Sequence, residues 1–209
     1  MLTITKIVVG AFDTNCYVVR TKALDALIID PGADAGAISK IISHCRLTVR
    51  AYLITHGHMD HISALEELWT QVKAPIAMHG SDAKWAFGES NQIPPYFSVP
   101  RRPGNLERIL KGGEKWNEND FRYEVIATPG HSPGGVCFYF PEENILFSGD
   151  TLFQDSVGRT DLPGGDMKQL TNSLQILAAL PPQTKVYPGH GPETTIAREI
   201  EFNPFLRSG

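Results

Sequence analysis

The feature that most constrains this fold is a dense group of histidine and aspartate side chains directly after an apolar segment. Residues 51–54 read AYLI, and residues 55–61 that follow read THGHMDH. A short apolar run of this kind predicts a buried strand, so the polar group should lie at the carboxyl end of that strand. Imidazole and carboxylate groups bind borderline divalent metals at neutral pH. The group therefore predicts a metal centre, with His56, His58, Asp60 and His61 as candidate ligands.

Three further candidate ligands follow other predicted strands. His131 lies in the segment TPGHSPGG, Asp150 ends the segment LFSGD, and His190 lies in YPGHGP. Glycine or proline flanks each of them, which places them on tight loops at strand ends, where a rigid scaffold commonly holds catalytic groups. His44 and His79 lack such a setting, and we expect them to be structural or solvated. The four residues of the cluster and these three make seven candidate ligands, more than one tetrahedral zinc ion uses, so we expect two adjacent metal ions.

The rest of the chain alternates between strand and helix patterns, which predicts an α/β layered fold. We expect helices over about residues 34–45, 62–72, 81–87 and 167–177, with the carboxylate of Asp34 capping the first and His61 in the first turn of the second. We expect strands over residues 2–9, 16–20, 26–30, 49–54, 76–78, 121–127, 135–140, 144–148 and 185–187. Residues 88–108 are rich in proline and are either a lid over the site or a plain surface insertion.

Composition limits the class of protein and its partners. The 209 residues, 42% apolar and 20% charged, suit a single globular domain over residues 1–209. A net charge of −4 gives no electrostatic reason to expect nucleic acid or an anionic membrane as a partner. The start of the chain lacks the pattern of a secretory signal, and no apolar run reaches the roughly 20 residues of a membrane span. We expect a cytoplasmic protein that acts on a small molecule; its oligomeric state stays open.

The order of the motifs resembles a known family. The pattern His-x-His-x-Asp-His, followed by a distant Gly-His, a Gly-Asp and a second Gly-His, is similar to that of the metallo-β-lactamase superfamily, and Asp30-Pro31-Gly32 resembles the early turn of that family. The resemblance implies a four-layer αββα sandwich, in which two mixed β-sheets are flanked by helices and the metals lie at one edge.

The resemblance also implies a division of the ligands between two metal ions. His56, His58 and His131 would bind the first ion, Asp60, His61 and His190 would bind the second, and Asp150 would bridge them. Zinc is the expected metal, although nitrogen and oxygen ligands without thiolate also accept iron or manganese. Two such ions can share a hydroxide that attacks a carbonyl carbon, and we expect Asp60 to orient this hydroxide as well as to bind metal.

Within the superfamily, the chain resembles glyoxalase II, which hydrolyses hydroxyacylglutathione thioesters such as S-lactoylglutathione. The segments TNCY (14–17), GDTLF (149–153) and NPFL (203–206) carry this similarity. Arg159 stands about where glyoxalase II places a basic glutathione contact, so we expect it to bind a substrate carboxylate, unless it pairs with Asp161 or Asp155. Full-length glyoxalase II has a further helical domain that supplies glutathione contacts, and we expect this chain to lack it. The resemblance thus supports the thioester class more strongly than glutathione itself.

Five alternatives compete with the thioester hydrolase. A secreted β-lactamase is disfavoured because the start of the chain lacks a signal pattern and because Asp150 stands where many such enzymes use cysteine. The segment GRTD (158–161) also resembles persulfide dioxygenases, in which His56, His131 and Asp150 would bind a single iron ion. A nuclease is disfavoured by the mild acidity and the lack of a basic, aromatic-rich arm, and a lactonase uses the same metal chemistry. A non-catalytic binding module is disfavoured by the intact ligand set.

Overall fold

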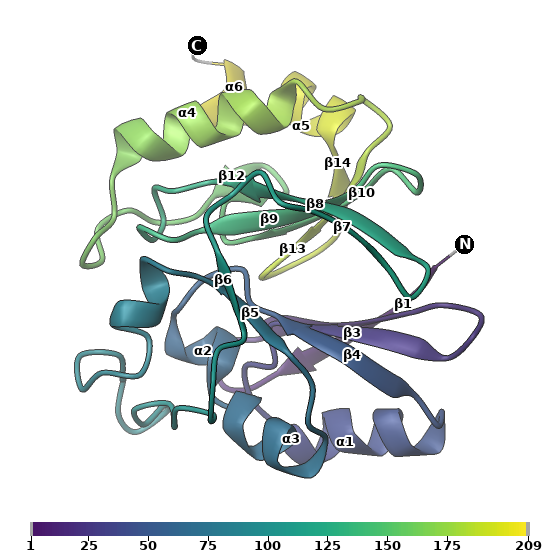
Figure 1. Cartoon of the computed structure of the whole chain (residues 1–209). Coiled ribbons are helices and arrows are strands. Elements are labelled where there is room, and N and C mark those ends of the chain that lie inside the picture. Colours follow the sequence, from purple (N-terminus) through teal and green to yellow (C-terminus); the bar gives the residue numbers. More distant parts are fainter. Residues whose placement is uncertain (1, 208–209) are drawn as a thin grey trace.

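Two six-stranded β-sheets face each other, and each is built from one part of the chain (Figure 1). The computed structural model describes residues 2–207. The first sheet has the order β1-β2-β3-β4-β5-β6, formed by β1 (Thr3–Val9), β2 (Thr14–Arg20), β3 (Asp25–Ile29), β4 (Thr48–Leu53), β5 (Ile76–His79) and β6 (Arg108–Leu110). The second has the order β14-β13-β10-β9-β8-β7, formed by β7 (Lys115–Glu118), β8 (Phe121–Ala127), β9 (Val136–Phe140), β10 (Ile145–Gly149), β13 (Lys185–Pro188) and β14 (Thr194–Thr195).

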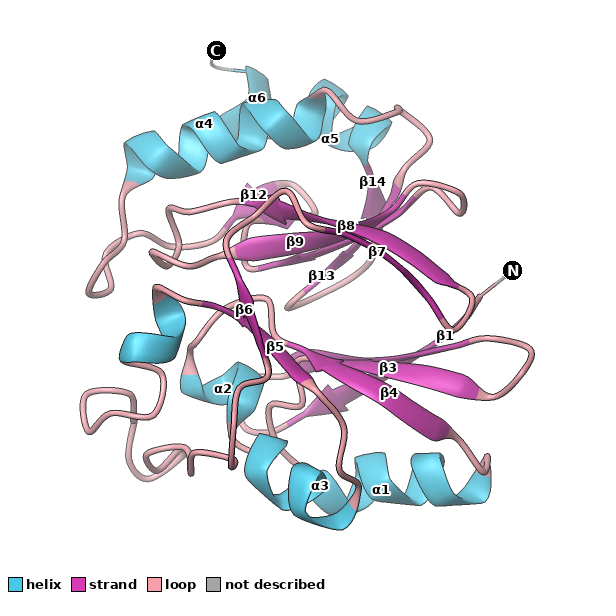
Figure 2. Cartoon of the chain, in the orientation of Figure 1, coloured by secondary structure: helices cyan, strands magenta, loops and turns pink. Residues whose placement is uncertain are grey.

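Helices cover the outer face of each sheet, as Figure 2 shows. Those beside the first sheet are α1 (Ala35–His44), α2 (Met59–Ile62) and α3 (Leu65–Gln71). Those over the second sheet are α4 (Met167–Ala178), α5 (Ile196–Phe202) and α6 (Pro204–Arg207). A 3-10 helix η1 (Asp82–Lys84) and a small sheet of β11 (Leu152–Phe153) and β12 (Ser156–Val157) complete the elements described. The expected four-layer αββα order is confirmed.

The alternation of side chains along the strands explains the layers. In β2, Cys16 and Val18 point into the layer that packs against the helices, whereas Tyr17 and Val19 point into the space between the sheets. The ring of Tyr17 there contacts Phe147 of the second sheet, with ring centroids 5.1 Å apart. Because both faces of such a sheet are buried, its central strands read as continuous apolar runs rather than alternating ones.

Strand directions bring the predicted ligand loops to one edge. β9 runs antiparallel to both β8 and β10, and β13 runs parallel to β10, so β8, β10 and β13 all end at the same edge of the second sheet. The end of β4 in the first sheet meets this edge, since the backbone N–H of Val136 donates to the carbonyl oxygen of Thr55 over 2.8 Å. Every predicted ligand follows one of these four strand ends.

The structure corrects three expectations about helices. The helix expected over residues 81–87 is wrong, because only η1 forms there. Asp34 does not cap α1: its backbone is left-handed, with φ 53°, and its carboxylate accepts a hydrogen bond from the N–H of Gly10 instead. The helix expected over 62–72 is broken into α2 and α3, and His61 belongs to α2.

Several short helices and strands were not predicted from the sequence. They are β6, β7, β11, β12, β14, α5 and α6. Most residues of the 88–108 segment lie outside helices and strands, although its Ile93 and Phe97 form a β-bridge with each other. Among residues 2–207, no helix is both long enough and apolar enough to cross a bilayer.

Candidate metal centre

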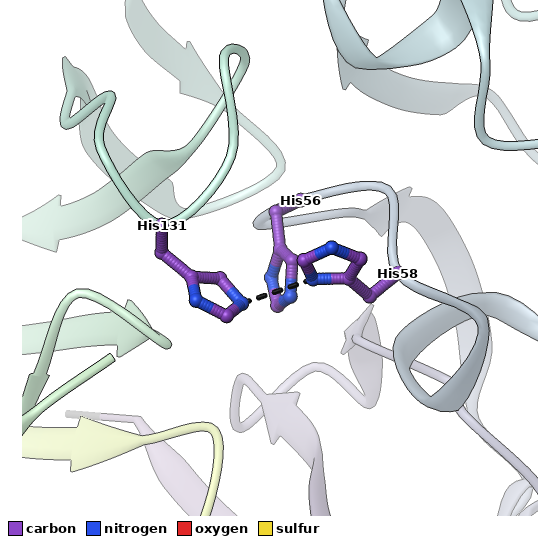
Figure 3. Close-up of side chains that lie close together, drawn as sticks. All are labelled: His56, His58 and His131. Atoms are coloured by element: carbon purple, nitrogen blue, oxygen red, sulfur yellow. Dashed lines mark hydrogen bonds between the residues drawn. The ribbon is translucent and has the colours of Figure 1, made fainter. Parts of the chain in front are cut away.

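Three histidines from two loops converge at the edge between the sheets. His56 and His58 lie on the loop after β4, and His131 lies on the loop between β8 and β9; Figure 3 shows their imidazole rings turned toward one another. Nδ1 of His58 lies 2.9 Å from Nε2 of His131, and one ring nitrogen from each of the three lies within 4.8 Å of the other two. All three side chains are buried. We call this group the histidine half-site.

A second group lies beside it and contains a carboxylate. Asp60 and His61 come from α2, and His190 follows β13. Oδ2 of Asp60 lies 3.3 Å from Nε2 of His190 and 3.5 Å from Nε2 of His61. The three candidate ligand atoms again lie within 4.8 Å of one another. We call this group the carboxylate half-site.

Asp150 lies between the two half-sites. Its Oδ2 is 3.5 Å from Nε2 of His131 and 3.5 Å from Nε2 of His190, and its Oδ1 is 3.4 Å from Nε2 of His61. A Cβ at Gly189 would lie 2.1 Å from Oδ1 of Asp150, so only glycine lets the loop after β13 approach this closely. Asp150 thus occupies the position that a bridging ligand requires.

Hydrogen bonds on the far side of the rings fix which nitrogen faces the site. Nδ1 of His131 donates to the carbonyl oxygen of Arg159 over 2.7 Å, and Nδ1 of His190 donates to that of Phe12 over 3.0 Å. Nδ1 of His61 lies 3.0 Å from Oδ2 of Asp30. Such partners hold a metal-binding imidazole in one tautomer and one orientation. In all three residues they leave Nε2 free to face the site.

Unpartnered buried atoms show that the site fits a metal. Nε2 of His56, Nε2 of His61 and Oδ1 of Asp150 are buried, yet none has a hydrogen-bond partner among the described residues. An unsatisfied buried polar atom costs about 1–3 kcal/mol. A metal ion would satisfy such lone pairs, and nitrogen and oxygen donors suit zinc, iron or manganese. The assignment of the seven residues as ligands stays a prediction, now with a geometry that suits it.

The two half-sites differ in charge. Burial lowers the pKa of His56 well below its ordinary value, and burial together with the nearby His131 lowers the pKa of His58 to about 4. Burial would also lower the pKa of His61, but Asp60, Asp150 and Asp30 raise it to about 10. In the metal-free protein at neutral pH, His56 and His58 are therefore neutral, whereas His61 is an imidazolium paired with carboxylates.

The same electrostatics act on the rest of the carboxylate half-site. Burial would raise the pKa of Asp60, but His61, His190 and a hydrogen bond from Oγ1 of Thr14 (3.0 Å) hold it well below its ordinary value. The pKa of His190 is raised in spite of its burial, because Asp60 accepts from it and Asp150 lies close. The carboxylate half-site thus consists of ion pairs before any metal binds.

Two residues that the sequence did not mark as functional, Asp82 and Asn91, hold the ligand loops in place. Asp82, fully buried in η1, accepts hydrogen bonds from the N–H of Gly57 (2.8 Å), the N–H of Gly134 (2.6 Å) and Oγ of Ser132 (2.7 Å). It therefore ties the loop of His56 and His58 to the loop of His131. Asn91 donates to the carbonyl oxygen of Gly57 over 2.8 Å. No spacing signal in the sequence marks either residue, because their partners are distant along the chain.

Asp30 also belongs to the support of the site. Its carboxylate accepts from the N–H of Thr55 (2.8 Å) and from Oγ1 of Thr55 (2.6 Å), besides its contact with Nδ1 of His61. Asp30, His56 and His61 form a third group with metal-like spacing. The hydrogen bonds of Asp30 already occupy both of its oxygens, so we assign this residue to the orientation of His61 rather than to a metal.

A cavity of about 530 Å³ opens onto the two half-sites. His58, Asp60, His131, Asp150 and His190 form its polar floor. Its walls are mainly apolar and include Phe12, Met59, Trp85, Ile93, Pro133, Leu162 and Pro163. Arg159 also lines the cavity, but its guanidinium is hydrogen-bonded to Asp161, as the alternative expectation had it. Asp155 pairs with Arg198 instead.

Relatives of known sequence cover almost the whole chain. A probable metallo-hydrolase, YqgX of Bacillus subtilis, is 37% identical over 95% of this chain and 94% of its own length. The hydroxyacylglutathione hydrolase GloC of Haemophilus influenzae is 34% identical over 96% of both chains. These similarities extend well beyond the ligand motifs.

Solved structures support the same relationship. BLEG-1, described as a B3 metallo-beta-lactamase, is 38% identical with a TM-score of 0.90, over 98% of this chain and 99% of its own. TTHA1623, solved in a di-iron-bound form, is also 38% identical, with a TM-score of 0.88, over 97% of this chain and 100% of its own. ETHE1 of Myxococcus xanthus is 26% identical, with a TM-score of 0.77, over 97% of this chain and 83% of its own. The family model of the metallo-beta-lactamase superfamily matches residues 9–190, and the chain belongs to that superfamily.

Proposed function

We propose that this metal-dependent hydrolase cleaves thioesters of the hydroxyacylglutathione type, such as S-lactoylglutathione. One observation carries the proposal: all seven predicted ligands converge, and five of them form the floor of an apolar-walled cavity large enough for a small acyl thioester. The similarity to GloC of H. influenzae supports this substrate class.

The residues of the floor have distinct roles in this proposal. The histidine half-site and the carboxylate half-site would each hold one divalent ion, with Asp150 shared between them. Bound metal ions would supply Lewis acidity and a water molecule whose pKa falls to around 7. Hydrolysis adds one water to the carbonyl carbon and breaks the C–S bond. One proton of the water goes to the sulfur, which leaves as a thiol, and the other is released to solvent as the acyl group becomes a carboxylate. Asp60, kept ionised and held by Thr14, would accept a hydrogen bond from that water and orient it.

The walls would position the substrate and limit the access of water. Phe12, Trp85 and Ile93 offer apolar contact to the acyl and thiol parts. Residues 90–93 of the proline-rich 88–108 segment line the cavity, which supports a role for this segment as a lid. Arg159 at the cavity wall would contact a polar end of the substrate.

A second candidate is a persulfide dioxygenase with one iron ion held by His56, His131 and Asp150. The GRTD segment and the similarity to ETHE1 of M. xanthus support it, and the di-iron form of TTHA1623 shows that a close structural relative holds iron. Zinc is our proposal for the resident metal. Metal content and oxygen chemistry separate the two candidates.

The experiment measures three reactions with one preparation loaded with zinc and, in parallel, with iron. We expect hydrolysis of S-lactoylglutathione by the zinc form, without oxygen uptake in the presence of glutathione persulfide. A β-lactam is the third substrate, because BLEG-1 is 38% identical. Oxygen uptake without thioester cleavage would replace the proposal by the dioxygenase, and β-lactam cleavage alone would replace it by a lactamase. Asp60→Asn should remove the thioesterase activity, while Asp25→Asn, which removes a carboxylate that pairs with Arg50 outside the cavity, should keep it.

A further inference from the structure

The cavity wall carries very little positive charge. Among the described residues that line the cavity, Arg159 is the only lysine or arginine. Its backbone is fixed to the site, because its carbonyl oxygen accepts the hydrogen bond from Nδ1 of His131. Away from the metal-binding floor, Arg159 is therefore the side chain of the wall that can attract a negative charge on the thiol part of the substrate.

An aspartate two residues along the chain already occupies one edge of this guanidinium. Nε of Arg159 donates to Oδ1 of Asp161 and Nη2 donates to Oδ2, both over 2.6 Å. The hydrogen bond from Arg159 lowers the pKa of Asp161 to about 2, so the carboxylate is ionised throughout the neutral range. The pair is held in a bidentate geometry and has no net charge.

The electrostatic consequence concerns the thiol part of a thioester. Glutathione carries two carboxylates and one ammonium group, so an acyl-glutathione is anionic at neutral pH. A neutral Arg159–Asp161 pair attracts such an anion much less than a free guanidinium would, and Asp161 itself repels it. The apolar walls formed by Phe12, Trp85 and Leu162 instead favour the binding of an uncharged, apolar thiol part.

We propose that Asp161 is a specificity-determining residue, which neutralises Arg159 and shifts the preference of the cavity toward thioesters whose thiol part is uncharged. This inference rests on the proposed thioesterase function and concerns the thiol part of the substrate: S-lactoylglutathione is cleaved, but less efficiently than the same acyl group on an uncharged thiol. Asp161 is suited to a test by substitution, because 66% of its side chain is exposed and it contributes nothing to the core.

The test compares two thioesters that share the lactoyl group, S-lactoylglutathione and the uncharged lactoyl-N-acetylcysteamine. The quantity measured is the ratio of kcat/KM for the first to that for the second. In Asp161→Asn we expect this ratio to rise roughly fivefold at low ionic strength, which is the size expected for one exposed charge. The rise should largely disappear near 1 M salt, where the Debye length is about 3 Å.

Two matched variants identify the cause. Asp155→Asn breaks an exposed bidentate pair with Arg198, at 2.6 and 2.9 Å, outside the cavity lining, and it should leave the ratio unchanged. Arg159→Met combined with Asp161→Asn should remove the rise, since the guanidinium is then absent. An unchanged ratio in Asp161→Asn, an equal rise in Asp155→Asn, or a rise that 1 M salt does not reduce would overturn the inference.

Binding of glutathione itself separates this inference from the proposed function. We expect calorimetry to show roughly fivefold tighter binding of glutathione to Asp161→Asn than to the unmodified protein. If neither thioester is hydrolysed while this difference is found, the thioesterase proposal fails and the role of Asp161 stands. If thioesters are hydrolysed and glutathione binds both proteins equally, the role of Asp161 fails and the thioesterase stands.

Discussion

The two half-sites draw their residues from corresponding parts of the chain, but these residues differ in protonation in the metal-free protein. Each takes two residues from the segment 56–61 of the first sheet and a third, His131 or His190, from a loop of the second sheet. Buried in the histidine half-site, His56 and His58 are neutral imidazoles. In the carboxylate half-site, Asp60 and Asp150 keep His61 protonated.

This difference teaches that similar ligand geometry does not imply similar metal binding. An ion entering the histidine half-site meets His56 and His58 in their neutral form. An ion entering the carboxylate half-site must displace protons from ion pairs, so its affinity depends on pH. The following predictions, ordered from the largest expected effect to the smallest, test whether the half-sites are separate in this sense.

Replacement of the shared residue should disable both half-sites. We expect Asp150→Ala to lower thioester turnover on the order of 10³-fold or more, since Asp150 lies within 3.5 Å of ligand atoms from both groups. Metal analysis of the purified variant should show a reduced content at both positions, with the circular dichroism spectrum retained. Near-normal turnover would contradict the shared role of Asp150.

Removal of one ligand from each half-site should separate them. We expect His58→Ala and His190→Ala each to lose one metal ion per chain and to lower turnover on the order of 10²-fold. The unmodified protein, loaded in the same way, is the control, and mass spectrometry of metals gives the stoichiometry. If either variant loses both ions, the half-sites form one unit and the comparison fails.

The pH dependence of metal affinity should differ between the half-sites. His61, with a pKa of about 10 in the metal-free protein, is protonated at pH 7 and must release its proton when a metal binds. The affinity of the carboxylate half-site should therefore rise by about tenfold per pH unit between pH 7 and 10. His58, with a pKa of about 4, is already neutral there, so the histidine half-site should weaken only as pH falls toward 4.

Calorimetry in two buffers of different ionisation enthalpy checks this. In His190→Ala only the histidine half-site keeps all of its residues, and in His58→Ala only the carboxylate half-site does. We expect about one more proton to be released per bound metal ion in His58→Ala than in His190→Ala, because His61 must lose its proton. Equal release in both variants would mean that the charges of the two half-sites do not differ as described.

The smallest effect is expected at Asp82, which holds the two loops of the histidine half-site together. Asp82→Asn puts an amide N–H₂ among the N–H donors of Gly57 and Gly134, which should destabilise the fold by about 1–3 kcal/mol. We also expect the affinity of the histidine half-site for zinc to fall about tenfold, with the carboxylate half-site little changed. Denaturant unfolding measures the loss of stability, and zinc competition with a chelator measures the loss of affinity. Asp25→Asn is the matched control; equal losses in both variants would contradict a local role for Asp82.

The sequence could locate the seven candidate ligands because each of them follows the end of a predicted strand. His131, Asp150 and His190 each follow an apolar run and stand beside glycine or proline, so the pattern shows both the residue and its place in the fold. The long amphipathic pattern of α4 and the apolar runs of the central strands were similarly clear.

The residues that hold the ligand loops in place could not be predicted in this way. Asp82 and Asn91 stand in segments without periodicity. The groups of the ligand loops that they hydrogen-bond lie 25 to 52 residues from Asp82 and 32 to 34 residues from Asn91 along the chain. The expected helix over 81–87 failed at the same place, because the carboxylate of Asp82 accepts hydrogen bonds from distant loops rather than starting a helix. Asp34 likewise bonds Gly10, 24 residues away, instead of its own helix. Edge strands such as β6, with three residues, are too short for a pattern to form.

The division of each half-site between two sheets affects when the protein can acquire metal during its synthesis. The segment 56–61 leaves the ribosome long before His131 and His190 have been made, and it then holds only two ligands of each set. A nascent chain of that length therefore completes neither half-site. Metal uptake becomes a late event that reports the docking of the second sheet onto the first.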